Sequence, residues 1–166
     1  MSLLPESISR IWRAAPPELR WLRPQDAAAC ARLHAASFLH GWQAGDFEAY
    51  ARDEGCCALG AFAGAKMLVG ASIARRSGAE AEILTIMVDP AWRGQNIARQ
   101  LMERTLAELA AQGVSKVFLE VEHDNLAACA LYRRLAFADI ARRQAYYARA
   151  DGTRAEAIVM RRDLAN

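Results

Sequence analysis

The stretch Ile83-Leu84-Thr85-Ile86-Met87-Val88-Asp89-Pro90-Ala91-Trp92-Arg93-Gly94-Gln95-Asn96-Ile97-Ala98-Arg99-Gln100-Leu101-Met102 decides the interpretation of this chain. It begins as an apolar strand, leaves the strand at a proline, and passes through a polar turn into an amphipathic helix. The first N–H groups of a helix have no intrahelical partner, and the helix dipole adds partial positive charge there. The stretch therefore predicts a ligand that is anionic at one end, with an ordinary strand-to-helix connection as the alternative.

Length, charge and cysteine spacing narrow the class of protein. The chain has 166 residues, the length of one domain, and a formal net charge of +2 that predicts no nucleic-acid surface. No apolar run reaches the roughly 18 residues that a membrane span requires. The four cysteines show no C-x-x-C spacing and follow no secretory leader, so we expect free thiols in the cytoplasm and no metal site. These cysteines are Cys30, Cys56, Cys57 and Cys129. We also expect no membrane partner and a monomer or weak dimer.

The hydrophobic pattern predicts a loose N-terminal extension over residues 1–17, with one short helix at 7–13, and a single α/β domain over 18–166. The expected strands cover 19–22, 56–63, 67–74, 82–88, 114–121, 140–148 and 156–162. One expected helix begins after Asp26, and three more cover 44–52, 97–112 and 125–135. This order predicts a central mixed, mostly antiparallel sheet with helices on both faces. In the long helix, six residues form the expected buried stripe: Ala98, Leu101, Met102, Thr105, Leu106 and Leu109.

Two glutamates interrupt an otherwise apolar strand near its C-terminal end. Strand alternation puts Glu120 and Glu122 on one face, opposite Leu119 and Val121. At the C-terminal end of a strand in an α/β sheet, such a face commonly borders a ligand crevice. Glu120 is therefore a candidate general base, and a pair of solvent-facing glutamates is the alternative.

Asn125 and Tyr132 are two helical turns apart on the following helix, so they share one face about 10 Å apart along its axis. An amide and a phenol aligned in this way could contact an extended ligand at two points. The same spacing also fits a simpler arrangement, in which Asn125 caps the helix and Tyr132 packs in the core.

The opening stretch contains neither the Gly-Lys-Ser/Thr of a P-loop nor the G-x-G-x-x-G of a dinucleotide fold. It resembles motif A of the GCN5-related N-acetyltransferases (GNAT), which is Gln/Arg-x-x-Gly-x-Gly/Ala after a Val-x-Pro strand exit. Arg93 and Ala98 fit this pattern, whereas Asn96 stands where the family has its central glycine. Asparagine is the non-glycine residue that best tolerates positive φ.

The second half resembles the ribosomal-protein-alanine N-acetyltransferase (RimI-like) branch of this family, over residues 82–160. The resemblance rests on 119–121, Asn125, 130–132, 135–137, Tyr146-Tyr147 and Asp151-Gly152, and Ala136 departs from the usual Leu-Gly-Phe. It implies acetyl-CoA as co-substrate and, as acceptor, the N-terminal alanine of a small-subunit ribosomal protein or another peptide. It also implies that Glu120 is the general base and that Tyr132 protonates the leaving thiolate of CoA.

The resemblance implies binding roles as well. Backbone groups of Ile86, Met87 and Val88 would align the thioester, and Asn125 would bind the pantetheine arm. Apart from the resemblance, a free N–H near Val88, where the strand splays from its neighbour, is our candidate for the oxyanion donor. The acceptor would contact Trp42, Tyr146 and Tyr147. The diphosphate would bind at Arg93, Gly94, Gln95, Asn96, Ile97, Ala98 and Arg99. Two other functions remain open: acetylation of a small amine such as a polyamine, amino acid or aminoglycoside, and non-catalytic acyl-CoA binding, which Asn96 motivates.

Overall fold

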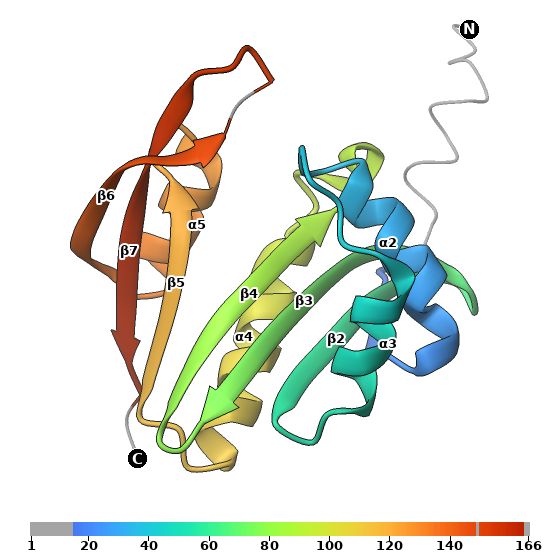
Figure 1. The fold of residues 1–166 in the computed structure, drawn as a ribbon. Coiled ribbons are helices and arrows are strands. Elements are labelled where there is room, and N and C mark those ends of the chain that lie inside the picture. Colours follow the sequence, from blue (N-terminus) through green and yellow to red (C-terminus); the bar gives the residue numbers. More distant parts are fainter. Residues whose placement is uncertain (1–14, 149, 165–166) are drawn as a thin grey trace, which may run out of the picture.

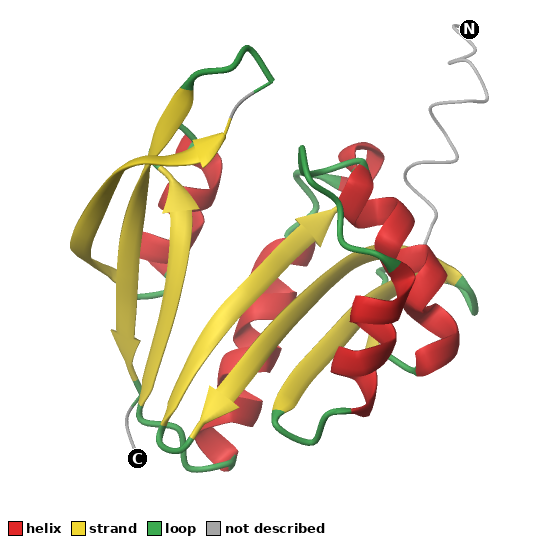
Figure 2. Cartoon of the chain, viewed as in Figure 1, coloured by secondary structure: helices red, strands yellow, loops and turns green. Residues whose placement is uncertain are grey.

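A computed structural model describes residues 15–148 and 150–164, which form one seven-stranded sheet flanked by helices (Figures 1 and 2). The strand order is β1-β2-β3-β4-β5-β7-β6, and every neighbouring pair is antiparallel except β4 and β5. The predicted mixed, mostly antiparallel sheet is therefore confirmed. The strands are β1 (Glu18–Trp21), β2 (Cys56–Ala63), β3 (Met67–Ser77), β4 (Glu80–Val88), β5 (Lys116–Glu122), β6 (Ala138–Ala148) and β7 (Arg154–Asp163).

Helices cover both faces of the sheet, as the order of elements predicted (Figure 2). On one face, Cys30, Leu33 and Phe47 of the first two helices pack against β2, β3 and β4. On the other face, the long helix and the helix after β5 pack against β4, β5 and β7. The helices are α2 (Ala27–Ala35), α3 (Ala44–Arg52), α4 (Ile97–Ala111) and α5 (Leu126–Arg134), with single 3₁₀ turns η1 (Pro24–Asp26) and η2 (Pro90–Trp92).

The predicted elements are all present within the described residues, but several bounds differ. The paired strands extend past the apolar runs, as where 75–77 pair with 80–82, because ladder hydrogen bonds continue into polar, exposed turns. Val114 lies before β5 because its N–H bonds to the carbonyl of Leu109 at the end of α4. The helix predicted over 7–13 lies outside the described residues.

The buried stripe of α4 also differs from the prediction at its first member. Ile97 is 2% exposed and belongs to the core, whereas Ala98 is half-buried and turns away from it. Gly70 on β3 makes this packing possible, because a Cβ there would lie 3.1 Å from Cγ2 of Ile97 and 3.2 Å from the carbonyl oxygen of Met87. The first turn of α4 therefore rests directly on the sheet backbone.

The two parallel strands separate halfway along their length (Figure 1). β4 and β5 pair from Glu80 and Lys116 to Ile83 and Leu119, and no pairing continues beyond that point. A β-bulge lies at the same level, where Ile73 pairs with Thr85 but Ala74 pairs with Ile83, so that Leu84 is the extra residue. The second half of β4 keeps β3 as a partner and is open on its β5 side.

Candidate active site

A cleft of about 650 Å³ lies where the two parallel strands separate. It runs between the end of β4, the start of α4 and one side of α5, and its volume is in the range of small-molecule sites. Its walls include eleven residues predicted from the sequence, namely Ile86, Met87, Val88, Arg93, Gly94, Asn96, Ile97, Ala98, Arg99, Asn125 and Tyr132. Of the predicted cofactor residues, Gln95 alone is not part of the wall.

The turn before α4 has the backbone shape of an anion-binding helix entrance. The Asp89 carboxylate accepts the N–H of Ala91 at 2.8 Å and so ends the strand. Gly94 has φ +76°, and Asn96, the N-cap residue, has φ +65° and ψ +11°. Asn96 thus adopts the left-handed conformation that a glycine would take, as its tolerance of positive φ predicted. The first-turn N–H groups of Ile97–Arg99 border the cleft and have no acceptor within the helix.

Two arginines add positive charge to this end of the cleft. Nε of Arg93 donates to the carbonyl oxygen of Val88 at 3.3 Å, which folds the side chain back over the strand exit. Arg99, one turn into α4, pairs with Glu103 at 2.7 Å. Guanidinium groups beside a helix entrance favour an anionic ligand such as a diphosphate.

The α5 wall combines both of the roles that the sequence left open. Oδ1 of Asn125 accepts the N–H of Ala128 at 3.2 Å, so Asn125 does cap the helix. Tyr132 is 5% exposed, and its ring lies 6.0 Å from that of Phe137, so it does pack in the core. Both residues also border the cleft. A structural role and a place in the cleft wall are therefore compatible at these two positions.

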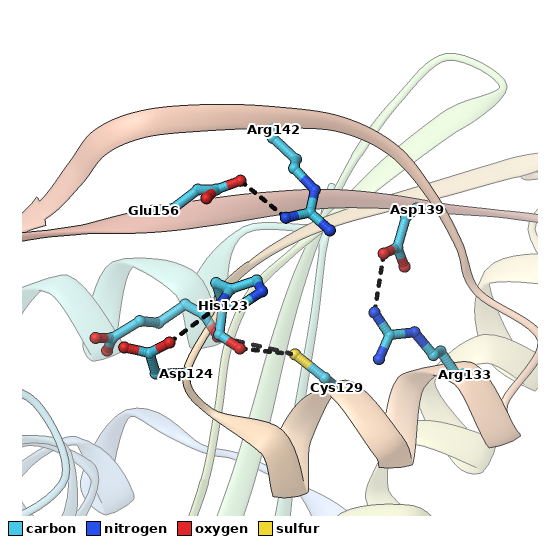
Figure 3. A network of polar contacts seen from close by, with 8 residues as sticks. His123, Asp124, Cys129, Arg133, Asp139, Arg142 and Glu156 are labelled. Atoms are coloured by element: carbon cyan, nitrogen blue, oxygen red, sulfur yellow. Dashed lines mark hydrogen bonds and ion pairs between the residues drawn. The ribbon is translucent and has the colours of Figure 1, made fainter.

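One ion pair joins α5 to β6, and another joins β6 to β7 (Figure 3). Arg133 pairs with Asp139 at 2.8 Å and so joins the helix to β6, while Arg142 pairs with Glu156 at 3.2 Å and joins β6 to β7. The Cys129 thiol donates to the carbonyl oxygen of His123 at 3.9 Å, which is a weak contact.

Glu120 lies beside the strand separation, one residue past the last β4–β5 pair. Its neighbours Leu119 and Val121 belong to the same hydrophobic cluster as Tyr132, so strand alternation turns Glu120 to the other face of the sheet. Its side chain is 17% exposed, and Oε1 lies 2.9 Å from Nη1 of Arg143. The alternative of a freely solvated glutamate is therefore wrong for Glu120.

Of the residues predicted to contact the acceptor, Trp42 is described with its side chain and does not border this cleft. Trp42 packs against the buried His34 and against Phe47, with ring centroids 4.8 and 5.6 Å apart. Tyr146 and Tyr147 lie near the end of β6, where Tyr147 pairs with Ala155, and their side chains lie outside the described part of the structure.

Sequence reasoning missed six residues of the cleft wall. Phe38 stacks on His34 at 4.3 Å and is 43% exposed, so it presents an aromatic face at the cleft. His34 itself is structural: its Nδ1 accepts the N–H of Trp42 at 3.1 Å, and burial lowers its pKa. An exposed aromatic just after a helix was the available signal. The six residues are Ser37, Phe38, Trp92, Ala127, Ala128 and Leu131.

Residues 15–148 and 150–164 contain no cluster of His, Cys, Asp and Glu that could hold a metal ion. Within the same ranges, no helix has both the length and the apolar character needed to cross a membrane.

Comparison with known proteins agrees with this geometry. The chain is 38% identical to the N-alpha-acetyltransferase RimI of Mycobacterium tuberculosis over 153 residues, which cover 89% of this chain and 93% of that protein. It is 42% identical to the [ribosomal protein bS18]-alanine N-acetyltransferase of Escherichia coli over 81 residues, about half of each chain. The crystal structure of the Escherichia coli ribosomal-protein-S18-alanine N-acetyltransferase superposes with a TM-score of 0.81 and 28% identity, over 90% of this chain and 96% of that one.

The family model described as Acetyltransferase (GNAT) family matches residues 16–137, which include the β4–α4 turn, Glu120 and Tyr132. The match spans most of the chain and ends after the α5 wall of the cleft. The resemblance seen in the sequence is therefore confirmed, and the chain belongs to the GNAT family of N-acetyltransferases.

Proposed function

We propose that the protein transfers the acetyl group of acetyl-CoA to the N-terminal α-amine of a peptide, with the N-terminal alanine of a small-subunit ribosomal protein as its acceptor. The observation that carries the proposal is the position of Glu120 and Tyr132 on opposite faces of the sheet beside one strand separation. The similarity to the Mycobacterium tuberculosis and Escherichia coli enzymes supports the choice of acceptor.

The cleft supports the binding of CoA at two ends. The helix entrance at Ile97–Arg99, together with Arg93, would hold the diphosphate. Asn125 would contact the pantetheine arm along the α5 wall. The thioester would then lie beside Ile86–Val88, where β4 has no strand partner on its β5 side and a backbone N–H near Val88 can stabilise the oxyanion.

The opposite placement of the two side chains supports a direct transfer. The amine nitrogen approaches from the face of Glu120 and bonds to the carbonyl carbon of the thioester. The C–S bond breaks, the proton of the new ammonium passes to Glu120 through water, and the Tyr132 hydroxyl gives a proton to the departing thiolate. Base and acid need not compete for one position, because the separated strands give access from both faces.

An α-amine is the acceptor that this chemistry suits best. At pH 7.4 about a quarter of an α-amine with a pKa near 8 is neutral, whereas only about 0.1% of a lysine amine with a pKa near 10.4 is neutral. A single carboxylate base is therefore sufficient for the first acceptor. The alternative of a small-amine acetyltransferase would instead require a closed acidic pocket around the acceptor.

The test is CoA release from acetyl-CoA with a short alanine-initiated peptide, compared with the same peptide blocked at its lysines and with one blocked at its N-terminus. We expect turnover with the first two and none with the third. Acetylation confined to lysine side chains or to free polyamines would contradict the proposed acceptor. Tight CoA binding without turnover on any amine would instead indicate a non-catalytic acyl-CoA-binding module.

A further inference from the structure

The carboxylate proposed as the base is already engaged by an arginine from the C-terminal hairpin. Nη1 of Arg143 on β6 lies 2.9 Å from Oε1 of Glu120 on β5, and β7 lies between these two strands. Glu120 is registered with Val159, and Arg143 with Ala157, so the contact passes over two short apolar residues of β7. The guanidinium therefore reaches across a strand to the site of proton transfer.

This ion pair differs from the other arginine pairs of the hairpin. Arg142, the preceding residue, projects to the opposite face and pairs with Glu156, where Figure 3 shows both residues above α5. That pair lies far from the open edge of β4 and serves as a structural comparison. The Glu120 carboxylate is only 17% exposed, and a carboxylate with so little access to water depends on its counter-ion.

Within residues 15–148 and 150–164, the cation in contact with Glu120 is Arg143. On the same face, the register places Glu122 two residues along β5 and Arg161 on β7 opposite Phe118. Arg161 is itself paired with Asp163 at 3.0 Å. Glu82 of β4 lies opposite Phe118 as well, on the other side of β5.

We propose that Arg143 is a positioning and selectivity residue: its guanidinium fixes the Glu120 carboxylate and disfavours an ammonium beside it, so that the site takes the acceptor amine in its neutral form. The inference rests on the proposed function, since it concerns the amine that Glu120 receives. A protonated amine could pair with Glu120 only by competing with a fixed like charge, which disfavours the charged form within about 4–6 Å. The proton released after attack then passes to Glu120 while Arg143 stays charged.

This arrangement favours α-amines over lysine side chains. A site that excludes ammonium groups draws on the neutral fraction of each acceptor, which is larger for the α-amine by more than two orders of magnitude, about 25% against 0.1%. Without Arg143, an ammonium would bind Glu120 as an ion pair. The bound amine would then hold its proton to higher pH, and turnover would fall at neutral pH.

The experiment measures kcat and KM of the full chain between pH 6 and 9.5 with an alanine-initiated, lysine-blocked peptide. We expect Arg143→Met to move the acid limb of kcat upward by about one pH unit, a roughly tenfold loss at pH 7 that is recovered near pH 9.5, without a rise in KM. Arg143→Lys, which keeps the positive charge, should show little of this shift. Arg142→Met, which breaks the comparison pair, should keep the original profile.

Two results separate the inference from the function on which it rests. If the unmodified protein does not acetylate the α-amine, the proposed function is wrong and the inference falls with it. If the unmodified protein is active and Arg143→Met loses activity equally at every pH, or loses none, the proposed function stands and Arg143 has no selective role.

Discussion

Oδ1 of Asn125 accepts the N–H of Ala128 at 3.2 Å while the same side chain borders the cleft. One oxygen therefore caps α5, and the amide N–H₂ group is the part that can bind a ligand. Asn125→Asp keeps the capping oxygen and loses the donor, whereas Asn125→Ala loses both. We expect Asn125→Asp to keep the stability of the original protein but to bind CoA more weakly. Asn125→Ala should also bind CoA more weakly, and its free energy of unfolding should fall by about 1 kcal/mol. Thermal unfolding and CoA titration of both variants check this, and equal CoA affinity in Asn125→Asp would exclude the donor role.

Removal of the proposed base should affect turnover and spare CoA binding. Glu120→Gln keeps the size of the side chain but cannot accept a proton, so we expect kcat to fall by about 10² to 10⁴ with CoA affinity close to the original. Glu122→Gln, two residues along the same strand face, is the matched control and should keep most of its activity. Comparable losses in both variants would show that charge on this face, and not one base, is what matters.

Ala136 holds a left-handed backbone at the C-terminal end of α5, with φ +61°. The N–H of Phe137 bonds to the carbonyl oxygen of Tyr132 at 3.0 Å across it, a helix ending that usually has glycine at this position. We expect Ala136→Gly to raise the free energy of unfolding by about 1 kcal/mol. Ala130→Gly, an exposed position inside the same helix, should lower it by about the same amount. Denaturant unfolding of both variants provides the measurement, and a loss of stability in Ala136→Gly would contradict the argument.

Burial of His34 makes stability depend on pH in one direction. Because burial lowers its pKa below the value of about 6.5 in the unfolded chain, both states are neutral above that pH and the contribution is fully present. As pH falls below about 6.5, the imidazole binds a proton in the unfolded chain but not yet in the folded protein. The free energy of unfolding therefore decreases until the pH reaches the lower pKa of the folded state. We expect His34→Asn, which keeps an acceptor for Trp42, to lose less stability between pH 7 and 5. His40→Asn, at an exposed position, should behave as the original protein does.

Two buried threonines should respond oppositely to the same substitution. Oγ1 of Thr105 lies 2.8 Å from Oγ of Ser72, whereas Oγ1 of Thr85 has no hydrogen-bond partner among the described residues. Thr105→Val leaves the buried Ser72 hydroxyl without its partner and should lower the free energy of unfolding by about 1–2 kcal/mol. Thr85→Val removes a hydroxyl that has no partner within residues 15–148 and 150–164 and should leave stability unchanged or raise it. Unfolding curves of the pair test the difference. A loss in Thr85→Val as large as that in Thr105→Val would mean that water or a ligand normally occupies the Thr85 site.

Local pattern was sufficient for most of the elements and for one end of the site. The apolar run that ends at Pro90 predicted β4, and the polar turn after it predicted the helix entrance, because both depend on near neighbours in sequence. The nine predicted cofactor residues between Ile86 and Arg99 that border the cleft do so for the same reason. The two departures from the family glycines were also visible in the sequence. Asn96 and Ala136 are the non-glycine residues with positive φ in the described part of the chain.

The tertiary structure alone decided how distant parts of the chain meet. The exact point at which β4 and β5 separate, after Ile83 and level with a bulge in the pairing of β4 with β3, is a matter of register between strands and not of local pattern. The ion pair of Arg143 with Glu120 joins two residues that are 23 positions apart in the sequence and lie on strands separated by β7. Sequence periodicity fixes which face a side chain takes within its own strand, but neighbouring strands and their register determine what that side chain touches.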